Sequence, residues 1–320
     1  MTEYESVREG AAGLIDLSTA RGRIHVSGSE ATMFLNGLIT NDVKNLAENR
    51  WMPAVFPTVQ GRLIGAVRVI RRSDSTFLID TETASHESVL KTVSRFTLAG
   101  DFKVSDVTDE TALLTLQGKG AAEILQNVFD RGVSDLPQNG VAETTWQNFQ
   151  ITIIRASHTG EDGFDLVIDS SRKAELRQAL EAAGAQPVGD DTFEILRVEA
   201  GIARFGQDMD ETNVVPETNL DDAVSYTKGC YVGQEIIVRI KHRGHPAKKL
   251  TRFRFETDQQ IEPGAIIRSK ENQEIGRVTS AVISPRLGSI GLGYVRYEYV
   301  ADGTQVVVGD GIDAIVGIDG

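Results

Sequence analysis

The sequence contains a single cysteine, Cys230, among its 320 residues. One thiol cannot form an intramolecular disulfide, so nothing in the chain points to an oxidising compartment. Nor can it hold an iron–sulfur cluster alone, because such clusters usually take about four thiolates. At most, Cys230 supplies one ligand to a cluster shared with a partner or a second copy.

Long apolar runs are also missing from the sequence. No stretch reaches the roughly 18 consecutive apolar residues of a membrane-spanning helix. The N-terminus, MTEYESVREGAAGLIDL, is acidic and lacks the basic start and apolar run of a secretory signal. We therefore expect a cytoplasmic protein, monomeric and without a membrane partner.

Positive charge is scarce overall, with 33 lysines and arginines against 46 acidic residues and a net charge of −13. Such an excess of acid argues against generic binding to nucleic acid or to an anionic membrane. Residues 236–255 nevertheless contain no acid. This segment is either a local anion site or a solvated pair of basic strands. Its cationic residues are Arg239, Lys241, Arg243, Lys248, Lys249, Arg252 and Arg254.

Several catalytic motifs are absent. The sequence has no HExxH metal motif, no GxSxG nucleophile elbow and no GxxxxGK[ST] phosphate loop. His242 and His245 stand close to Cys230 and allow a zinc site as an alternative. The Gly-His-Pro context is typical of a loop, however, and its cationic neighbours would repel a metal ion. We predict no metal site.

What the sequence does contain is an α+β pattern of strands and helices through its first 200 residues. Strands separated by polar turns are followed by segments whose apolar residues recur at helical spacing. The second round, with strand, helix, two strands and helix, has the order of a ferredoxin-like unit. The predicted helices lie within 27–42, around the apolar face of Val89, Leu90, Val93 and Phe96, and at 120–129, 170–185 and 191–201, and the predicted strands lie at 62–70, 76–80, 112–117, 151–155 and 164–169.

The pattern changes after residue 246, where six short strands follow one another without a helix. Glycine-rich turns separate them, which is typical of a small antiparallel barrel or sandwich. The fold class expected is therefore α+β with an all-β domain at the C-terminus. The strands expected are LTRFRFE, GAIIRS, IGRVTSAVI, SIGLGYVR, TQVVV and IDAIVGI.

Two polar segments are candidates for chemistry. Cys230 lies in KGCYVGQE (228–235), where Lys228 and a following helix N-terminus would favour the thiolate. The alternative is a partly buried structural cysteine. In HTGEDGFDLVID (158–169), Glu161 and Asp162 stand on a loop before an apolar strand and could accept hydrogen bonds from an amino-bearing heterocycle. The alternative there is a plain turn.

KGCYVGQE followed by HRGH (242–245) resembles the signature of the YgfZ family of folate-binding proteins, which includes mitochondrial factors for maturing 4Fe–4S proteins. Three further segments resemble the glycine-cleavage T-protein, an aminomethyltransferase of the same superfamily: LITNDV (38–43), TGEDGFDL (159–166) and LRVEAGIARFGQDMDETNVVPE (196–217). The resemblance implies a cloverleaf of two ferredoxin-like α+β domains around a central channel plus a C-terminal antiparallel β-barrel. Its domains would be 1–45 with 105–200, 46–104 with 201–246, and 247–320.

The resemblance also implies a ligand, tetrahydrofolate or a one-carbon derivative, and roles for individual residues. Glu161 would bind the donor edge of the pterin, which suits a carboxylate. Arg197 would bind the carboxylates of the glutamate tail, which suits a guanidinium fork. Cys230 would be the working residue, with Lys228 lowering its pKa. Gly229, Tyr231, Gln234 and Arg243 would complete the binding site.

One departure from the T-protein affects the predicted activity. The T-protein carries an acidic pair, one member of which is catalytic, where this chain has Gly65 and Ala66 in GRLIGAVRV (61–69). Without that carboxylate no obvious group assists proton transfer at the folate nitrogen. We therefore expect a factor for assembly or repair of iron–sulfur enzymes, including radical enzymes that thiolate tRNA. The alternatives are a folate-dependent aminomethyltransferase and a binding module in which Cys230 is passive.

Overall fold

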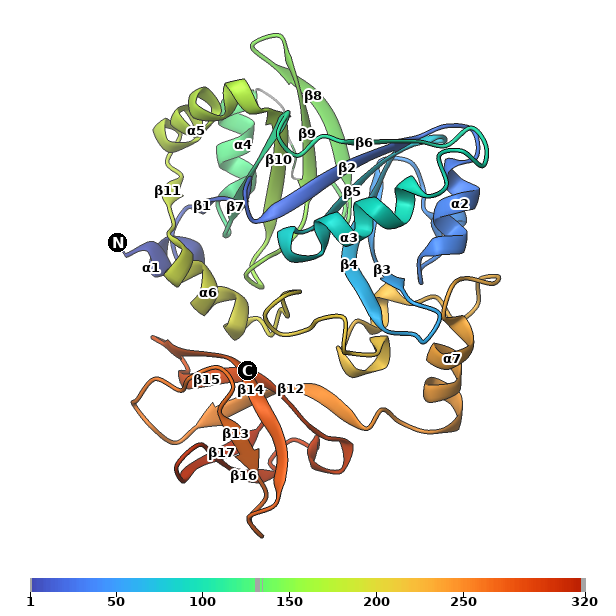
Figure 1. Ribbon diagram of the computed structural model, residues 1–320. Helices are drawn as coiled ribbons and strands as arrows, with labels where there is room; N and C mark the ends of the chain where they lie inside the picture. Colours follow the sequence, from blue (N-terminus) through green and yellow to red (C-terminus); the bar gives the residue numbers. More distant parts are fainter. Residues whose placement is uncertain (1, 130–132, 134, 318–320) are drawn as a thin grey trace. The chain divides into compact units, whose positions relative to one another are not determined.

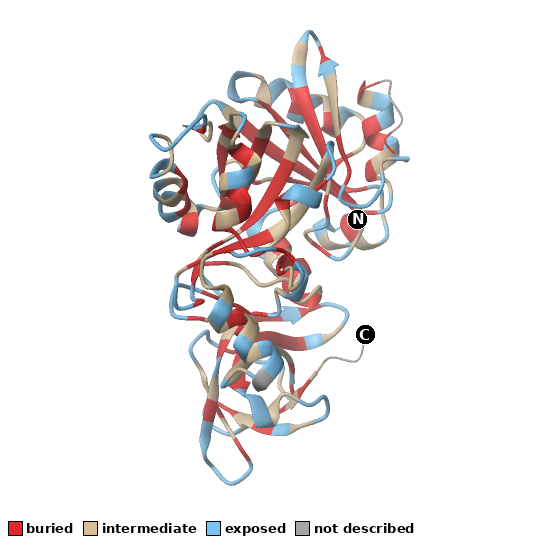
Figure 2. Ribbon diagram, turned by 90° about the vertical axis from the view of Figure 1, so that its right-hand side faces the viewer, coloured by how far each residue is buried: buried red, intermediate tan, exposed pale blue. Residues whose placement is uncertain are grey.

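The computed structural model describes residues 2–129, 133 and 135–317 (Figure 1). The chain divides into two compact units. The first comprises residues 1–57, 64–193 and 222–232, and the second comprises residues 58–63, 194–221 and 233–320. Among the described helices, none has the length and apolar character needed to span a membrane. In each unit the strands carry most of the buried residues, while the outer helix faces are exposed (Figure 2).

A six-stranded sheet forms one half of the first unit. Its strands are antiparallel except for the parallel pair β1 and β11. Helices α4 (Ala121–Phe129) and α5 (Lys173–Ala182) lie beside each other against this sheet and share its apolar core (Figure 1). In spatial order the strands are β11 (Gln186–Pro187), β1 (Gly13–Asp16), β7 (Thr111–Gln117), β10 (Gly163–Asp169), β9 (Phe149–Arg155) and β8 (Val141–Trp146).

A five-stranded sheet forms the other half of this unit. Helices α2 (Ala31–Leu38) and α3 (Thr83–Ser94) contribute to its core, and the short α1 (Glu3–Arg8) lies at the N-terminus. Short 3-10 turns lie at Val43–Asn45 and Ser170–Arg172. In spatial order the strands are β3 (Arg50–Pro57), β4 (Leu63–Ser73), β5 (Thr76–Glu82), β2 (Arg21–Ser27) and β6 (Lys103–Asp106).

The second unit contains a closed barrel of six antiparallel strands, completed where β17 pairs with β12. Helix α7 (Gln234–Arg243) precedes the barrel, and α6 (Asp190–Glu199) ends in this unit. Further 3-10 turns lie at Val215–Glu217, Asp221–Ala223 and Tyr297–Tyr299. The strands are β12 (Lys248–Phe255), β15 (Gly288–Arg296), β14 (Glu274–Ser284), β13 (Ile266–Arg268), β16 (Gln305–Val308) and β17 (Ile312–Val316).

The predicted α+β class and the six-stranded C-terminal barrel are confirmed, but the predicted domain boundaries do not follow the sheets. Residues 21–45, assigned to the first α+β domain, supply β2 and α2 to the five-stranded sheet. The chain changes sheet between Asp16 and Arg21, long before residue 45. Likewise, most of 201–246 groups with the barrel and not with the second α+β domain.

Candidate functional site

The loop that carries Cys230 is fastened to the segment after α2. The backbone N–H of Ser225 donates to the carbonyl of Thr40 at 3.0 Å, and that of Val232 donates to the carbonyl of Gly37 at 3.1 Å. Between these two attachments the thiol of Cys230 is exposed to solvent. The cysteine is therefore neither buried nor structural, and it is presented on a loop that is held at both ends.

Lys228 fastens this loop from the inside. Its ammonium group donates to the carbonyl oxygens of Asn36, Ile39 and Asn41 at 2.6, 3.0 and 2.6 Å. A cation suits the C-terminal end of α2, where backbone carbonyls are left without helical partners. Burial lowers the pKa of Lys228 to about 8, against the opposing charge of Asp42.

The contacts of Lys228 differ from those predicted. An ammonium group has three donors, and all three are directed at carbonyl oxygens. None is directed at the thiol of Cys230, so the predicted stabilisation of the thiolate by Lys228 has no contact in its favour. We treat Lys228 as a positioning residue for the loop.

Lys228 and Tyr231 are buried, and the two residues between them are exposed. Tyr231 is buried, its ring centroid lies 5.1 Å from the Lys228 ammonium nitrogen, and its hydroxyl has no partner among the described residues. Burial raises the pKa of Tyr231 to about 12. Gly229 is exposed beside Cys230, and a Cβ placed there would meet no atom within 4 Å. Of the predicted binding residues in this loop, Gly229 is therefore accessible while Tyr231 is not.

Helix α7 begins too late in the sequence to act on the thiol. Its N-cap is Gly233, in a left-handed conformation with φ of 76°, and Gln234 is its first residue. The macrodipole acts within about one turn of a helix end, and Cys230 precedes the cap. The thiol therefore lies near the start of a helix, as one of the two predicted placements has it, but before the helix cap and outside its first turn.

The remaining predicted residues of this motif lie in α7. The side chains of Gln234 and Glu235 make no hydrogen bond within the described part of the chain, so they do not fasten the loop. Arg243 ends the helix, and its side chain lies outside what the structure describes. Their predicted contacts with a folate remain predictions.

Glu161 lies in the loop between β9 and β10. One of its carboxylate oxygens accepts from the guanidinium of Arg8 at 3.0 Å, and the same nitrogen of Arg8 also donates to the carbonyl of Thr159 at 2.9 Å. The Glu161 side chain is 22% exposed, and its second carboxylate oxygen has no partner among the described residues. The carboxylate is thus held in place with one oxygen available, as a ligand-binding group requires.

Arg197 does not have the role that the sequence predicted. It is buried in α6, and its five N–H donors are all used within the second unit: by both oxygens of Glu194, by Asp208, by the carbonyl of Ile202 and by Ser280. A guanidinium has five donors and no more. None remains for the carboxylates of a folate tail, so we correct this assignment to a structural one.

The basic segment 236–255 does not assemble into an anion site. It divides into α7 and β12, and four of its cations, Lys241, Lys248, Lys249 and Arg252, have partners in the second unit. Lys241 and Lys249 both lie near Asp221, at 3.3 and 4.0 Å, and Arg252 donates to the carbonyl of Glu199. The absence of acids within the segment is compensated by acids outside it.

The sequence analysis missed a buried ionic cluster in the first unit. The Asp80 carboxylate on β5 accepts from the guanidinium groups of Arg21 and Arg68, and Arg68 also pairs with Asp165 of β10 at 2.6 Å. Burial alone would raise the pKa of Asp80, but the two arginines hold it below its usual range. The sequence did contain a signal for this cluster, namely single charged residues inside the otherwise apolar strands RLIGAVRVI and FDLVID.

The position predicted to lack the T-protein carboxylate lies on β4. A Cβ on Gly65 would come within 2.7 Å of Val89 and 2.9 Å of Ser85, so α3 leaves no room for a side chain. Ala66 is half-buried, and its carbonyl accepts from the hydroxyl of Thr81 at 2.9 Å. Neither residue supplies a group that can move a proton.

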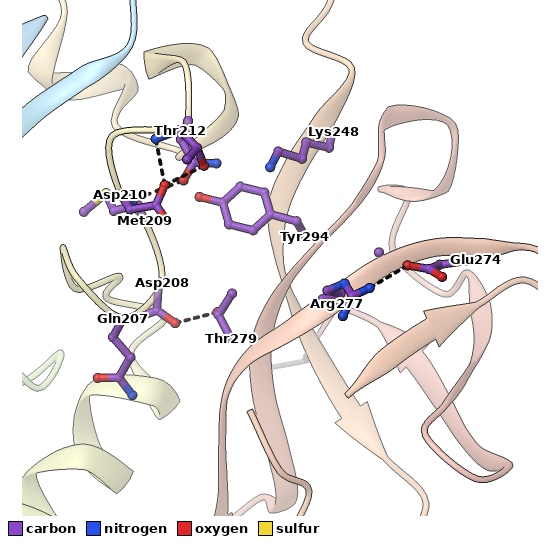
Figure 3. Close-up of a pocket in the computed structure, with 12 residues that line it drawn as sticks. Gln207, Asp208, Met209, Asp210, Thr212, Lys248, Glu274, Arg277, Thr279 and Tyr294 are labelled. Carbon is purple, nitrogen blue, oxygen red and sulfur yellow. Dashed lines mark hydrogen bonds and ion pairs between the residues drawn. The ribbon is translucent and has the colours of Figure 1, made fainter. Parts of the chain in front are cut away.

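A cavity of about 340 Å³ lies in the second unit and is lined by Lys248 of the basic segment and by residues of 207–213, within the segment that resembles the T-protein. Asp208 and Asp210 lie on one side and barrel residues on the other, with the Tyr294 hydroxyl directed toward Asp210 and Thr212 (Figure 3). That hydroxyl is buried without a partner among the described residues. Burial raises the pKa of Tyr294, with the carboxylates of Glu217, Asp208 and Asp210 adding to the effect. The hydroxyl therefore stays protonated.

Comparison with known proteins places these observations in a family. The GCVT N-terminal domain family matches residues 1–228, and the glycine cleavage T-protein C-terminal barrel domain matches residues 248–313. An aminomethyltransferase of Rubrobacter xylanophilus is 34% identical over 298 residues, covering 92% of this chain and 79% of its own. A probable aminomethyltransferase of Natronomonas pharaonis is 32% identical over 328 residues, covering 98% and 88%.

Among solved structures, the glycine cleavage system aminomethyltransferase T from Bartonella henselae matches with a TM-score of 0.90 at 24% identity. The match covers 98% of this chain and 87% of that one. At this identity the likeness establishes the fold alone, but the family match to residues 1–228 goes further. The chain belongs to the glycine cleavage T-protein family.

Proposed function

We propose that this chain is a tetrahydrofolate-binding protein that assists the assembly or repair of iron–sulfur enzymes, including radical enzymes that thiolate tRNA, through Cys230. The observation that carries the proposal is the exposed thiol on a loop that Lys228 fastens from the inside. A loop held in one conformation presents its thiol to a client protein or a cluster without first paying an ordering entropy.

The resemblance to the family supports one part of this proposal, the binding of folate. Glu161 supplies a fixed carboxylate with one oxygen available, which can accept hydrogen bonds from adjacent N–H donors of a pterin. Tetrahydrofolate or a one-carbon derivative of it is the cofactor that we expect. Arg197 is no longer part of the site, because all of its donors are used inside the protein.

Aminomethyl transfer is the second candidate, and the relatives favour it: those compared above are named as aminomethyltransferases. The local geometry on β4 is against it. A transferase needs a group that moves a proton at the folate nitrogen, and Gly65 is packed against α3 while Ala66 has no functional group. A third possibility is a binding module in which Cys230 is passive. It differs from the proposed function only in that its activity does not depend on the thiol.

Two measurements separate these candidates. Calorimetric titration with tetrahydrofolate, on wild type and on Glu161→Gln, tests the ligand: we expect binding by wild type and at least about tenfold weaker binding by the variant, since a charged acceptor is lost. If titration gave no heat with either protein, tetrahydrofolate would be excluded as the ligand.

The thiol is tested in cells that depend on this gene. We expect Cys230→Ser to lower the activity of iron–sulfur enzymes while leaving tetrahydrofolate binding intact. Unchanged client activity would favour the passive module. Transfer of an aminomethyl group from a lipoyl-bound substrate to tetrahydrofolate by the purified chain would favour the transferase.

A further inference from the structure

His158 and Asp165 form a buried pair at the loop that carries Glu161. The Nε2 atom of His158 lies 3.0 and 3.1 Å from the two carboxylate oxygens of Asp165. The Asp165 side chain is fully buried and the His158 side chain is 13% exposed. The two residues stand seven positions apart, one in the loop after β9 and the other on β10, so the turn of the chain at residues 158–163 brings them together.

Both members of the pair are held by other parts of the first unit. Asp165 pairs with Arg68 on β4 at 2.6 Å, and burial, which would raise the pKa of Asp165, is outweighed by its interactions with His158 and Arg68, which lower it. The backbone N–H of His158 donates to the side-chain oxygen of Gln117 at 2.8 Å. Phe193 packs edge-on against the imidazole, with ring centroids 6.4 Å apart.

This arrangement sets the tautomer of His158. An ionised carboxylate only accepts hydrogen bonds, so Nε2 must carry the proton and Nδ1 is left with its lone pair. Nδ1 has no hydrogen-bond partner within the described chain and is not among its buried, unpaired polar atoms. A carboxylate that orients an imidazole, fixes its tautomer and stabilises its protonated form is the arrangement of a general base.

The pair stands beside a residue that we expect to bind ligand. Glu161 lies three residues after His158 in the same loop, and Arg8 ties the intervening Thr159 carbonyl and the Glu161 carboxylate together. We propose that His158 is a proton-accepting group of the ligand site around Glu161, with Asp165 as its positioning residue. This rests on the proposed function, whose folate site it extends by one residue.

The proposed step is a simple proton transfer. An N–H bond of the bound heterocycle breaks, its electron pair stays on the ligand nitrogen, and the proton goes to Nδ1 of His158. The imidazolium then forms an ion pair with Asp165 and loses a proton to solvent through its exposed edge. Within the described chain, Asp165 contacts this imidazole and pairs in turn with Arg68, while the Glu161–Arg8 pair lies in the same loop.

The first test needs no ligand. Long-range ¹H–¹⁵N NMR spectra of the wild-type protein report the tautomer of each histidine, and His158→Gln identifies the signals of His158 by their loss. We expect the Nε2–H tautomer at about pH 8. An Nδ1–H tautomer, or rapid exchange between the two, would overturn the proposal.

The second test measures tetrahydrofolate affinity by calorimetry at about pH 8. We expect His158→Gln to bind about tenfold more weakly than wild type, because a glutamine amide has no basic nitrogen to take up a proton. His86→Gln is a matched control, since His86 also pairs with an aspartate, Asp106, at 2.8 Å, but its Nδ1 is buried.

The outcomes separate this proposal from the one on which it rests. Equal affinities of wild type and His158→Gln for tetrahydrofolate, with Glu161→Gln impaired, would overturn the role of His158 and leave folate binding in place. No heat from wild-type protein would overturn the folate assignment and the ligand of this site together. The NMR tautomer would still decide whether the pair itself exists in solution.

Discussion

Replacing Arg197 by methionine is the substitution for which the structure and the sequence predict opposite outcomes. The sequence places Arg197 against the tail of a folate, so its loss should weaken ligand binding and leave the fold intact. The structure places it inside the second unit, where it pairs with Asp208 at 2.7 Å and with Glu194 at 2.5 Å. Methionine keeps much of the volume and removes every donor.

The size of the effect follows from what the substitution leaves behind. The Asp208 side chain is fully buried, so without Arg197 a carboxylate remains inside the protein with neutral donors only. Breaking a buried ion pair from one side costs about 3–5 kcal/mol. The pair with Glu194 adds less, because that side chain is 23% exposed. We expect a loss of about 3–5 kcal/mol from the second unit.

The assay must report on the second unit by itself. Both tryptophans, Trp51 and Trp146, lie in the first unit, so their fluorescence during urea unfolding serves as an internal control that should not change. Hydrogen exchange of peptides from β14 and α6, followed by mass spectrometry, reports on the second. Arg197→Met should speed their exchange by about a hundredfold or more, since about 1.4 kcal/mol corresponds to a factor of ten.

A matched variant is Arg204→Met, whose guanidinium lies 3.4 Å from Glu194 but is 32% exposed. It should change exchange by less than about tenfold, because exposed pairs contribute about 1 kcal/mol or less. The reasoning would be refuted if Arg197→Met exchanged no faster than Arg204→Met. Weaker tetrahydrofolate binding with unchanged exchange would restore the role that the sequence gave to Arg197.

Three further predictions follow from the first unit and from α7. Lys228→Met should change the rate at which iodoacetamide alkylates Cys230 by less than about twofold, because the ammonium holds the loop and does not activate the thiol; a rate about tenfold lower would restore activation by Lys228. Gly233→Ala should lower the free energy of unfolding in urea by about 1–3 kcal/mol, since φ is 76° and the added Cβ would lie 2.4 Å from the Thr58 carbonyl. Gly229→Ala is the control and should leave this free energy unchanged, because a Cβ there lies in open space. Equal effects of the two substitutions would contradict this prediction. The pKa of Asp80 is lowered in the folded state. The stabilisation that its carboxylate provides is therefore complete above the unfolded pKa of about 4 and is lost as the pH falls below that value. Trp51 fluorescence should report the resulting acid unfolding, and acid unfolding that is unchanged in Asp80→Asn would argue against this prediction.

The elements predicted from the sequence are those whose hydrophobic period is regular. All six barrel strands and the helices α2 to α6 were found in this way, because each buries one regular face. Strand β8, VAETTW, was missed because three of its six residues are polar and only its two ends are buried. Helix α7 was missed because a left-handed glycine precedes it where a Ser, Thr or Asp cap would have marked a start.

The candidate site was predicted less well, since it depends on contacts between distant residues. The sequence singled out Cys230 and Glu161 correctly as polar residues on loops, but could not show which partners they have. Arg197 meets Ser280, 83 residues away, and Lys228 meets carbonyls about 190 residues earlier in the chain. The sequence therefore assigned these side chains to ligand or thiol contacts, although in the folded protein their N–H donors are bonded to other residues of the chain.

Cys230 and the residues that we propose to bind folate belong to separate loops, so their proposed functions can be tested separately. Cys230 lies on a loop fastened to the end of α2, whereas His158 and Glu161 lie on the loop between β9 and β10. If Cys230 serves clients and the other loop holds folate, Cys230→Ser and His158→Gln should fail in different assays. If one reaction uses both, the double variant should be no worse than the more damaging single variant, because residues of one catalytic unit are strongly non-additive. Additive losses would instead require two independent activities on one chain.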